Sequence, residues 1–422
     1  MSRFGTDGIR GRWPEPPLTP DTAAALGRAL RARVGEAPVV IGRDTRESGP
    51  ALRDALLIGM GGDVVDLGVL PTAGVSAALA QGLGAAGVVI TASHNPWTDN
   101  GLKVLGPGGG KLPTAEEAAL DAALDAPPTA APPLQLREVD GAALYQDAVL
   151  ACLPPGFTLR GLRVAVDAAH GAAWQTAPAL LGALGAEVVA LGCAPDGRNI
   201  NEGVGALHPD GLAQAVPAAG CAVGIALDGD ADRCVLVDGA GEILPGDGLL
   251  LLVARAPGVV GTVMCNAALE RALGALGVGF ERVAVGDRNV AERMAALDWP
   301  VGGEPSGHVL LAGGLPTGDG LLTALFVLGG GPDLRARLGG WRPDPQALVN
   351  ARVPAKPPLA SLGVDALQAA ALAAGASRVL LRYSGTEPKL RVMVEAPEQA
   401  LAERQARALA DALTERIRTS NA

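Results

Sequence analysis

Three passages of the chain repeat one order of hydrophobic helix, glycine turn and hydrophobic strand. They read ALLIGMGGDVVDLG (55–68), ALLGALGAEVVALG (179–192) and ALGALGVGFERVAVG (272–286). Repetition at this scale predicts three related α/β domains. Because the strands are continuously apolar and alternate with helices, we expect mixed, mostly parallel sheets covered by helices. A chain rich in Ala, Leu and Gly also resembles itself by composition alone, and that alternative stays open.

The last part of the chain follows another order, which predicts a C-terminal α+β domain. Strand, helix, two strands and a long helix are expected at 350–353, 364–374, 379–382, 389–395 and 398–418. Proline-rich stretches at 127–133 and 343–345 are typical of linkers. A chain of 422 residues is too long for one core. We therefore expect four domains, at 1–145, 146–240, 241–345 and 346–422.

Charge and cysteine content narrow the class of partner and compartment. The formal net charge is −10, which argues against nucleic acid as a partner because phosphate backbones select basic surfaces. The 5 cysteines are scattered without a C-x-x-C pair, as expected of reduced thiols in a cytoplasmic protein. The first residues lack the apolar run of a signal peptide. The uncharged stretch 67–93 contains Pro71 and divides into a helix and a strand, so no membrane span is expected.

The strongest local signal is Asp-Gly-Asp-Ala-Asp-Arg at 228–233, between two apolar strands. Asp228, Asp230 and Asp232 at alternate positions of a turn can converge on one hard cation. A calcium EF-hand would need Gly at its sixth position and Glu at its twelfth, where this chain has Arg233 and Gly239. A phosphatase with Asp228 as nucleophile is a weak match. A Mg²⁺ site fits best; a purely structural acidic turn stays open.

A second loop, Thr-Ala-Ser-His-Asn-Pro at 91–96, follows an apolar strand. Open α/β sheets place their sites just past the carboxyl ends of strands, where Ser93 stands. By itself the hexapeptide is an ordinary turn. Lys103, a short way downstream, offers an acid/base group or a phosphate clamp.

Two later loops carry groups suited to sugar and phosphate. The glycine-rich loop 302–308 offers Glu304, Ser306 and His308, which match the donors and acceptors of sugar hydroxyls; a structural role for the histidine remains open. The loop 382–388 combines a glycine with hydroxyls and guanidiniums, which favours a phosphate nest. A simple hairpin turn with solvated charges is the alternative there.

These four loops, in this order and after Phe-Gly-Thr-Asp-Gly-Ile-Arg-Gly at 4–11, resemble the α-D-phosphohexomutase superfamily over nearly the whole chain. The resemblance implies four domains around a central cleft, with a mobile C-terminal domain. It implies a phosphorylated Ser93 and one Mg²⁺ per chain, held by that serine, Asp228, Asp230 and Asp232. The sugar would contact Glu304, Ser306 and His308. The non-transferred phosphate would be held by Arg382, Ser384, Gly385, Thr386, Arg391 and Arg288. Charge stabilisation and proton transfer would fall to Lys103, His94, Arg10 and Arg233.

Further motifs, at 41–49, 199–203, 285–288 and 318–324, are similar to the branch that interconverts glucosamine 6-phosphate and glucosamine 1-phosphate through a 1,6-bisphosphate. That branch belongs to amino-sugar metabolism and supplies a peptidoglycan precursor. Pro305 and His170 depart from its pattern, and the former leans towards the glucose and mannose phosphate branch. A phosphosugar phosphatase and a non-catalytic sugar-phosphate sensor are the alternatives from other classes. A monomer or a homodimer is expected.

Overall fold

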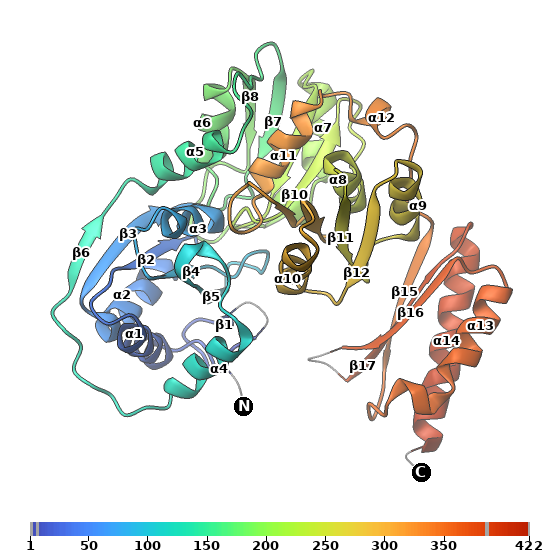
Figure 1. Cartoon of the computed structure of the whole chain (residues 1–422), viewed down its shortest axis with the longest axis horizontal. Helices are drawn as coiled ribbons and strands as arrows, with labels where there is room; N and C mark the ends of the chain where they lie inside the picture. The colour runs from blue at the N-terminus through green and yellow to red at the C-terminus, as the bar shows by residue number, and fades with distance from the viewer. Residues whose placement is uncertain (1–2, 6–7, 385–387, 421–422) are drawn as a thin grey trace.

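The fold is described from a computed structural model, which places residues 3–5, 8–384 and 388–420. Four sheets follow one another in chain order along an arc, with the first and the fourth at its two ends (Figure 1). The first three are mostly parallel and the fourth is antiparallel. This confirms the predicted fold class of α/β domains followed by a C-terminal α+β domain.

The first sheet has six strands and helices on both faces. Its order is β1 (Ile9–Arg12), β5 (Asp99–Leu105), β4 (Ala86–Ile90), β2 (Val39–Arg43), β3 (Asp63–Val69) and β6 (Gln135–Glu138). Alternate residues of the inner strands point to opposite faces. Val39 and Ile41 join a buried cluster with α1 (Pro20–Val34) and α2 (Gly49–Met60), whereas Val40 joins the cluster that contains α3 (Thr72–Ala80). Two further helices complete the domain, α4 (Thr114–Ala123) and α5 (Gly141–Ala151).

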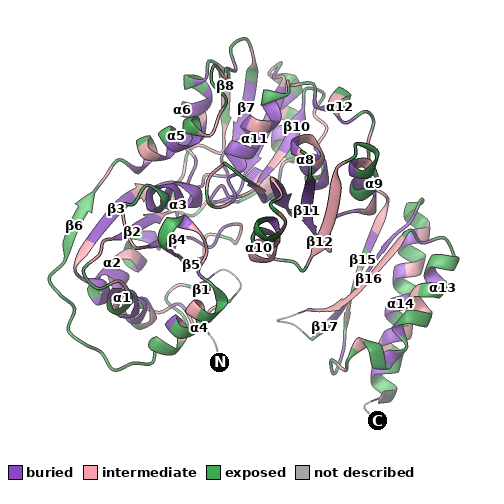
Figure 2. Ribbon diagram, viewed as in Figure 1, coloured by how far each residue is buried: buried purple, intermediate pink, exposed green. Residues whose placement is uncertain are grey.

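The second and third sheets each have four strands, of which one edge strand is antiparallel. Their orders are β10 (Cys234–Asp238), β9 (Val223–Leu227), β7 (Arg163–Asp167), β8 (Glu187–Leu191), and β12 (Gly279–Val283), β11 (Gly258–Thr262), β13 (Val301–Gly303), β14 (Val309–Leu311). One buried cluster includes residues of both sheets, so the two pack as a unit (Figure 2). Their helices are α6 (Thr176–Ala183), α7 (Asp210–Ala218), α8 (Gly246–Val253), α9 (Ala267–Ala275), α10 (Asp287–Leu297), α11 (Gly320–Gly329) and α12 (Leu334–Arg337).

The fourth sheet has its own hydrophobic core. Its order is β15 (Gln346–Arg352), β17 (Lys389–Glu395) and β16 (Arg378–Tyr383), with α13 (Val364–Ala373) and α14 (Gln399–Ser420) packed on it. Short 3₁₀ turns lie at Pro107–Gly109, Gly205–Leu207 and Leu359–Leu362. The separate core explains why this sheet stands apart at the end of the arc in Figure 1.

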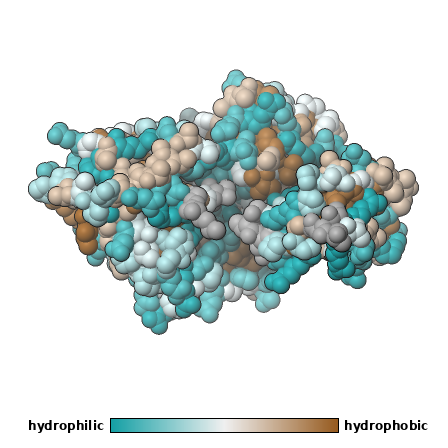
Figure 3. Space-filling view, turned by 90° about the horizontal axis from the view of Figure 1, so that it is seen from below, coloured by the Kyte–Doolittle hydropathy of each residue, from teal (hydrophilic) through white to brown (hydrophobic). Residues whose placement is uncertain are grey.

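The face of the molecule that is seen from below has no large continuous apolar area (Figure 3). Seen from below, most of the molecule is hydrophilic, with separate small apolar patches (Figure 3). The most exposed large hydrophobic residues, Ile58 and Leu276, lie in different domains. Within the described part of the chain, no helix is both long and apolar enough to span a bilayer.

Candidate active site

Ser93 lies three residues past the end of β4 and faces the second domain. Its backbone has φ 51°, in the left-handed region that serine rarely adopts. The side chain is buried, and its Oγ donates to Asp228 Oδ2 at 2.7 Å. The serine loop of the first domain and the aspartate loop of the second therefore meet at one point.

The three aspartates converge on the turn between β9 and β10. Their carboxylate oxygens lie within 4.8 Å of one another, and all three side chains are buried. Ala231 takes φ 59° between them, which folds the turn tightly enough for alternate carboxylates to face one side. Asp230 Oδ1 is buried and has no hydrogen-bond partner among the described residues. An unpaired buried oxygen beside two other carboxylates suits a metal ligand, so this group could hold a divalent cation.

The pKa values of Asp228 and Asp232 also favour a bound cation at this turn. Burial, and then the charges of Asp232 and Asp230, raise the pKa of Asp228 to about 8. Burial also acts to raise the pKa of Asp232, but Lys103, His308 and Arg233 hold it well below its ordinary value. Burial and the neighbouring carboxylates thus disfavour the charged form of Asp228, which a bound cation would stabilise.

Two residues of the first domain hold Asp230 from the other side. Lys103 Nζ on β5 lies 2.6 Å from Asp230 Oδ2 and 3.2 Å from Asp232 Oδ2. Thr72, at the start of α3, donates from Oγ1 to the same Asp230 oxygen at 2.7 Å, and its N–H donates to the Asp230 carbonyl at 3.1 Å. The sequence analysis does not predict Thr72. A threonine after a proline is an ordinary helix start, and no local pattern connects it to a residue 158 positions away.

His94 is placed to exchange a proton with Ser93. Its Nδ1 lies 3.4 Å from Ser93 Oγ. Burial, followed by the charges of Arg233 and Arg10, lowers the pKa of His94. The ring is therefore neutral near pH 7 and can accept a proton. Arg233 also anchors the aspartate turn, since its N–H donates to Asp228 Oδ1 at 3.2 Å.

The third loop, between β13 and β14, brings His308 to the aspartates. His308 Nδ1 lies 3.8 Å from Asp232 Oδ1, and its Nε2 lies 3.6 Å from Asp287 Oδ2. Burial alone would lower the pKa of His308, but its hydrogen bond and charge interaction with Asp232, together with Asp287, raise it to about 9. Glu304 Oε1 accepts from the Gly286 N–H at 3.0 Å, while Ser306 is exposed.

The predicted phosphate-binding residues lie elsewhere. Arg382 and Arg391 are direct neighbours across β16 and β17, and Arg391 Nη2 donates to Ser384 Oγ at 3.4 Å. Gly385 and Thr386 lie outside the described residues. Arg288, at the start of α10, forms an ion pair with Glu117 of α4 at 2.6 Å. The structure thus gathers the serine, aspartate and histidine loops at one place, and leaves the pair of arginines on the fourth sheet.

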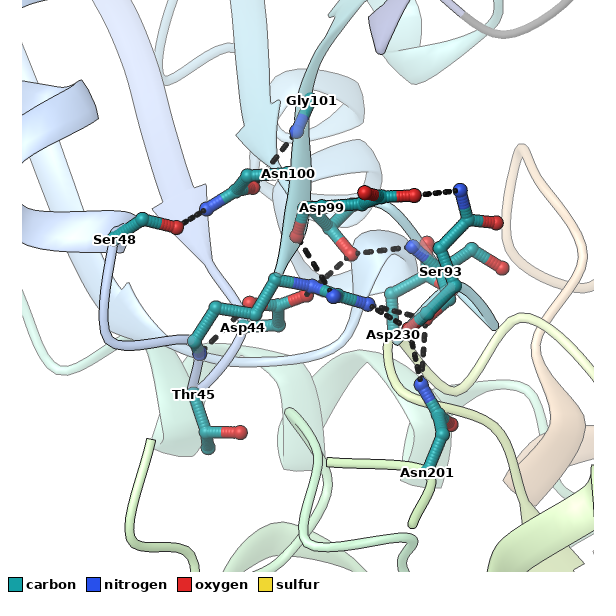
Figure 4. Close-up of polar contacts among 12 residues, drawn as sticks. Asp44, Thr45, Ser48, Ser93, Asp99, Asn100, Gly101, Asn201 and Asp230 are labelled. Carbon is teal, nitrogen blue, oxygen red and sulfur yellow. Dashed lines mark hydrogen bonds and ion pairs between the residues drawn. The ribbon is translucent and has the colours of Figure 1, made fainter. Parts of the chain in front are cut away.

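A second group that sequence reasoning missed lies behind the serine loop (Figure 4). Asp44 and Arg46 follow β2 and form a buried ion pair, with Arg46 Nε 2.8 Å from Asp44 Oδ2. Asn201 reaches over from the second domain and donates to the Ser93 carbonyl at 2.9 Å. The motifs 41–49 and 199–203 contain these residues, but nothing in the sequence relates either motif to Ser93.

Known proteins match the chain along its whole length. Models of phosphoglucomutase/phosphomannomutase domains match in order: α/β/α domain I at residues 1–130, domain II at 144–241, domain III at 245–329 and the C-terminal domain at 348–412. A solved phosphoglucomutase/phosphomannomutase family protein from Burkholderia thailandensis superposes with a TM-score of 0.81 at 28% identity, covering 99% of this chain and 98% of that one.

Curated relatives are more similar in sequence. The phosphoglucosamine mutase of Acidovorax sp. (strain JS42) is 47% identical, covering 97% of this chain and 98% of its own length. The enzyme of that name from Cupriavidus taiwanensis is 46% identical with the same coverage. The chain therefore belongs to the phosphoglucosamine mutase family, within the phosphoglucomutase/phosphomannomutase superfamily, and is a mutase, an isomerase.

Proposed function

We propose that this chain interconverts glucosamine 6-phosphate and glucosamine 1-phosphate, and that it carries the transferable phosphoryl group on Ser93. One observation carries the proposal: the Ser93 hydroxyl lies 2.7 Å from the first of three clustered, buried aspartates. A phosphate on Ser93 Oγ would lie within reach of a metal ion bound by these carboxylates.

The donor set fits Mg²⁺, which prefers oxygen ligands and tolerates an open position for a phosphate oxygen. Asp228, Asp230 and Asp232 would hold the ion together with an oxygen of the phosphorylated serine. When bound, the ion would neutralise charge on the phosphoryl group as it moves. Thr72 and Lys103 keep the aspartates in place from the first domain.

The transfer breaks the bond between Ser93 Oγ and phosphorus and forms one between phosphorus and a sugar hydroxyl oxygen. The hydroxyl loses a proton, and Ser93 Oγ regains one. His94, neutral and 3.4 Å from Oγ, is the residue best placed to serve the serine oxygen. Lys103 lies against two carboxylates, which favour its charged form, so its best-supported role is to face the phosphate as a cation.

The first product is a 1,6-bisphosphate, which must turn round before Ser93 recovers the other phosphate. Glu304, Ser306 and His308 would contact the sugar in either orientation. Arg382, Ser384, Arg391 and Arg288 would hold the phosphate that is not being transferred, together with Gly385 and Thr386. Exclusion of water during the turn separates a mutase from a phosphatase.

The free cysteines and the names of the relatives support the proposed compartment and substrate. All five cysteines are free thiols, as expected of a cytoplasmic enzyme. Glucosamine phosphate is favoured by the names of the relatives that match along nearly the full chain. Glucose and mannose phosphates are the alternative substrates, from the related branch of the superfamily.

Ser93→Ala tests the chemistry. The variant should fold normally, because it loses one hydroxyl, and its turnover should fall by at least about 10⁴-fold because no phosphoryl carrier remains. Wild type and variant would be assayed side by side with the 6-phosphates of glucosamine, glucose and mannose, with circular dichroism to verify the fold. Full activity of the variant would refute the phosphoserine. Stoichiometric release of phosphate by the wild type would indicate a phosphatase instead.

A further inference from the structure

The carbonyl groups of the serine loop converge on a single side chain, that of Arg46. Arg46 Nη2 donates to the carbonyls of Ser93 and Asn95, both at 2.8 Å. Its Nη1 donates to the carbonyl of Asp99 at 2.8 Å and also to that of Pro96. The side chain is completely buried. One guanidinium therefore holds four carbonyls of the segment that begins at Ser93.

The same side chain also reaches the amide of Ser93, through two intermediates. Arg46 Nε pairs with Asp44 Oδ2 at 2.8 Å, and this oxygen accepts from Thr91 Oγ1 at 2.6 Å. Thr91 Oγ1 in turn accepts from the Ser93 N–H at 2.9 Å. The N–H and the carbonyl of Ser93 are thus both tied to one buried ion pair.

This hydrogen-bond network restrains a serine whose backbone conformation is unfavourable by itself. A non-glycine residue at φ 51° is held in a sparsely populated conformation, which persists only where the surroundings impose it. Phosphoryl transfer needs donor and acceptor oxygens in line. Only arginine offers five donors in a planar fork, and a lysine ammonium cannot reach all of these acceptors at once.

We propose that Arg46 is a positioning residue for the transfer step, which holds Ser93 in the backbone conformation that turns its Oγ towards Asp228. This inference rests on the proposed function, because it requires that Ser93 carries the phosphoryl group. In these hydrogen bonds Arg46 contacts neither the Ser93 hydroxyl nor the metal-site aspartates Asp228, Asp230 and Asp232. Its effect on the reaction passes through the backbone of the loop.

The chain contains a matched control for a merely structural role. Arg31, on α1, is also nearly buried and also holds backbone carbonyls, among them those of Gly35, Ala37, Gly61 and Asp63. These carbonyls lie just before β2 and at the start of β3, at the opposite end of the sheet from Ser93. A lysine at either position removes a comparable set of hydrogen bonds, but only one of the two sets concerns the serine loop.

The experiment compares Arg46→Lys with Arg31→Lys in the full-length chain. We expect both variants to melt at lower temperature. Arg46→Lys should lower kcat about 100-fold, as misplacements of about 1 Å do, with KM within about 3-fold of wild type. Arg31→Lys should keep kcat within about 3-fold. Transfer of labelled phosphate from glucose 1,6-bisphosphate to Ser93, read by mass spectrometry, should slow in parallel with kcat.

The other possible results distinguish failure of this inference from failure of the proposed function. Equal kcat for the two lysine variants, or wild-type labelling of Ser93 in Arg46→Lys, would overturn the inference. If wild type itself takes no label on Ser93, the proposed function fails instead. Should Arg46→Lys not fold, Thr91→Val decides: it keeps the shape of the side chain and removes the link from the Asp44–Arg46 pair to the Ser93 N–H. Unchanged kcat and labelling in that variant would then overturn the inference.

Discussion

Arg382 and Arg391 stand directly opposite each other on adjacent strands, where like charges destabilise a sheet. Burial, and then the charge of Arg391, lower the pKa of Arg382. Two guanidiniums held side by side form a site that an anion would stabilise. At the residue scale, this pairing of like charges supports our proposal that the fourth domain binds a phosphate.

Arg382→Ala should accordingly weaken substrate binding. Loss of a charge-assisted hydrogen bond costs about 1.5–3 kcal/mol, so we expect KM to rise about 10- to 100-fold, with little change in Mg²⁺ affinity. Steady-state kinetics and metal titration on the same preparation measure both. Arg404→Ala, which alters an exposed arginine of α14, is the control. An unchanged KM for Arg382→Ala would contradict the assignment.

Single site residues could be predicted where residues close together in the sequence already form a ligand pattern. The alternate spacing of Asp228, Asp230 and Asp232 predicts a group that could hold a cation, and the structure brings their carboxylates together. Thr72 and Arg46 could not be predicted, because their roles arise from contacts between segments far apart in the chain. Their side chains are ordinary at a helix start and after a strand.

At the scale of elements, α8 begins with an acid that is harder to ionise in the folded protein than in the unfolded chain. Burial raises the pKa of Asp247 to about 6, although its Oδ2 accepts from the Asn266 N–H at 3.1 Å. In the unfolded chain the group ionises near its ordinary value of 3.8. Stability from the protonated form is therefore fully present below about pH 4 and is lost as pH rises through 6.

Asp247→Asn should remove this dependence, because asparagine imitates the protonated acid. The stability of wild type relative to the variant should fall by up to about 3 kcal/mol between pH 4 and pH 7, at about 1.4 kcal/mol per unit of pKa shift. Urea unfolding of both proteins across this range measures it, with Asp298→Asn at an α10 cap as a surface control. A constant difference between wild type and Asp247→Asn would show that Asp247 is ionised in the fold.

Elements were predictable where a regular apolar pattern marks them. The predicted limits of β17 agree with the structure, and the long C-terminal helix is displaced by only a residue or two. The antiparallel strand β5 is not predicted, because Asn100, Gly101 and Lys103 interrupt its apolar pattern although they are buried. The polar and glycine residues of β5 therefore mask the apolar pattern from which the strand could have been predicted.

At the scale of the whole molecule, the arrangement of the four sheets could be expected only from the resemblance to a family. Composition and periodicity give the elements of each domain, but they do not say which loops face each other. Contacts such as Lys103 with Asp230, or Asp287 with Lys111, join domains that are separate in sequence. The site exists because these interfaces form.

The junction of the third and fourth domains depends on one buried carboxylate. Glu395, at the end of β17, accepts from the Ala267 N–H at the start of α9 and from Arg378 Nη1, both at 2.9 Å. Arg378 also donates to the Cys265 carbonyl at 2.9 Å. Arg382 and Arg391 lie four positions further along the same two strands, or roughly 13 Å away. The sheet therefore connects the junction to the two arginines that we propose to bind phosphate.

Glu395→Gln should loosen this junction without touching the chemistry. The neutral amide keeps the shape, but it gives up charge-assisted hydrogen bonds worth about 1.5–3 kcal/mol, so amide exchange around residues 265–267 should accelerate about 10- to 100-fold. KM should rise by several-fold, because the arginines are held less firmly, while phosphorylation of Ser93 by a bisphosphate stays near the wild-type rate. Hydrogen exchange by mass spectrometry and steady-state kinetics test both effects, with the exposed Glu398→Gln as control. Wild-type exchange at 265–267 in Glu395→Gln would mean that the junction is held by other contacts, such as those between Asn266 and Asp344.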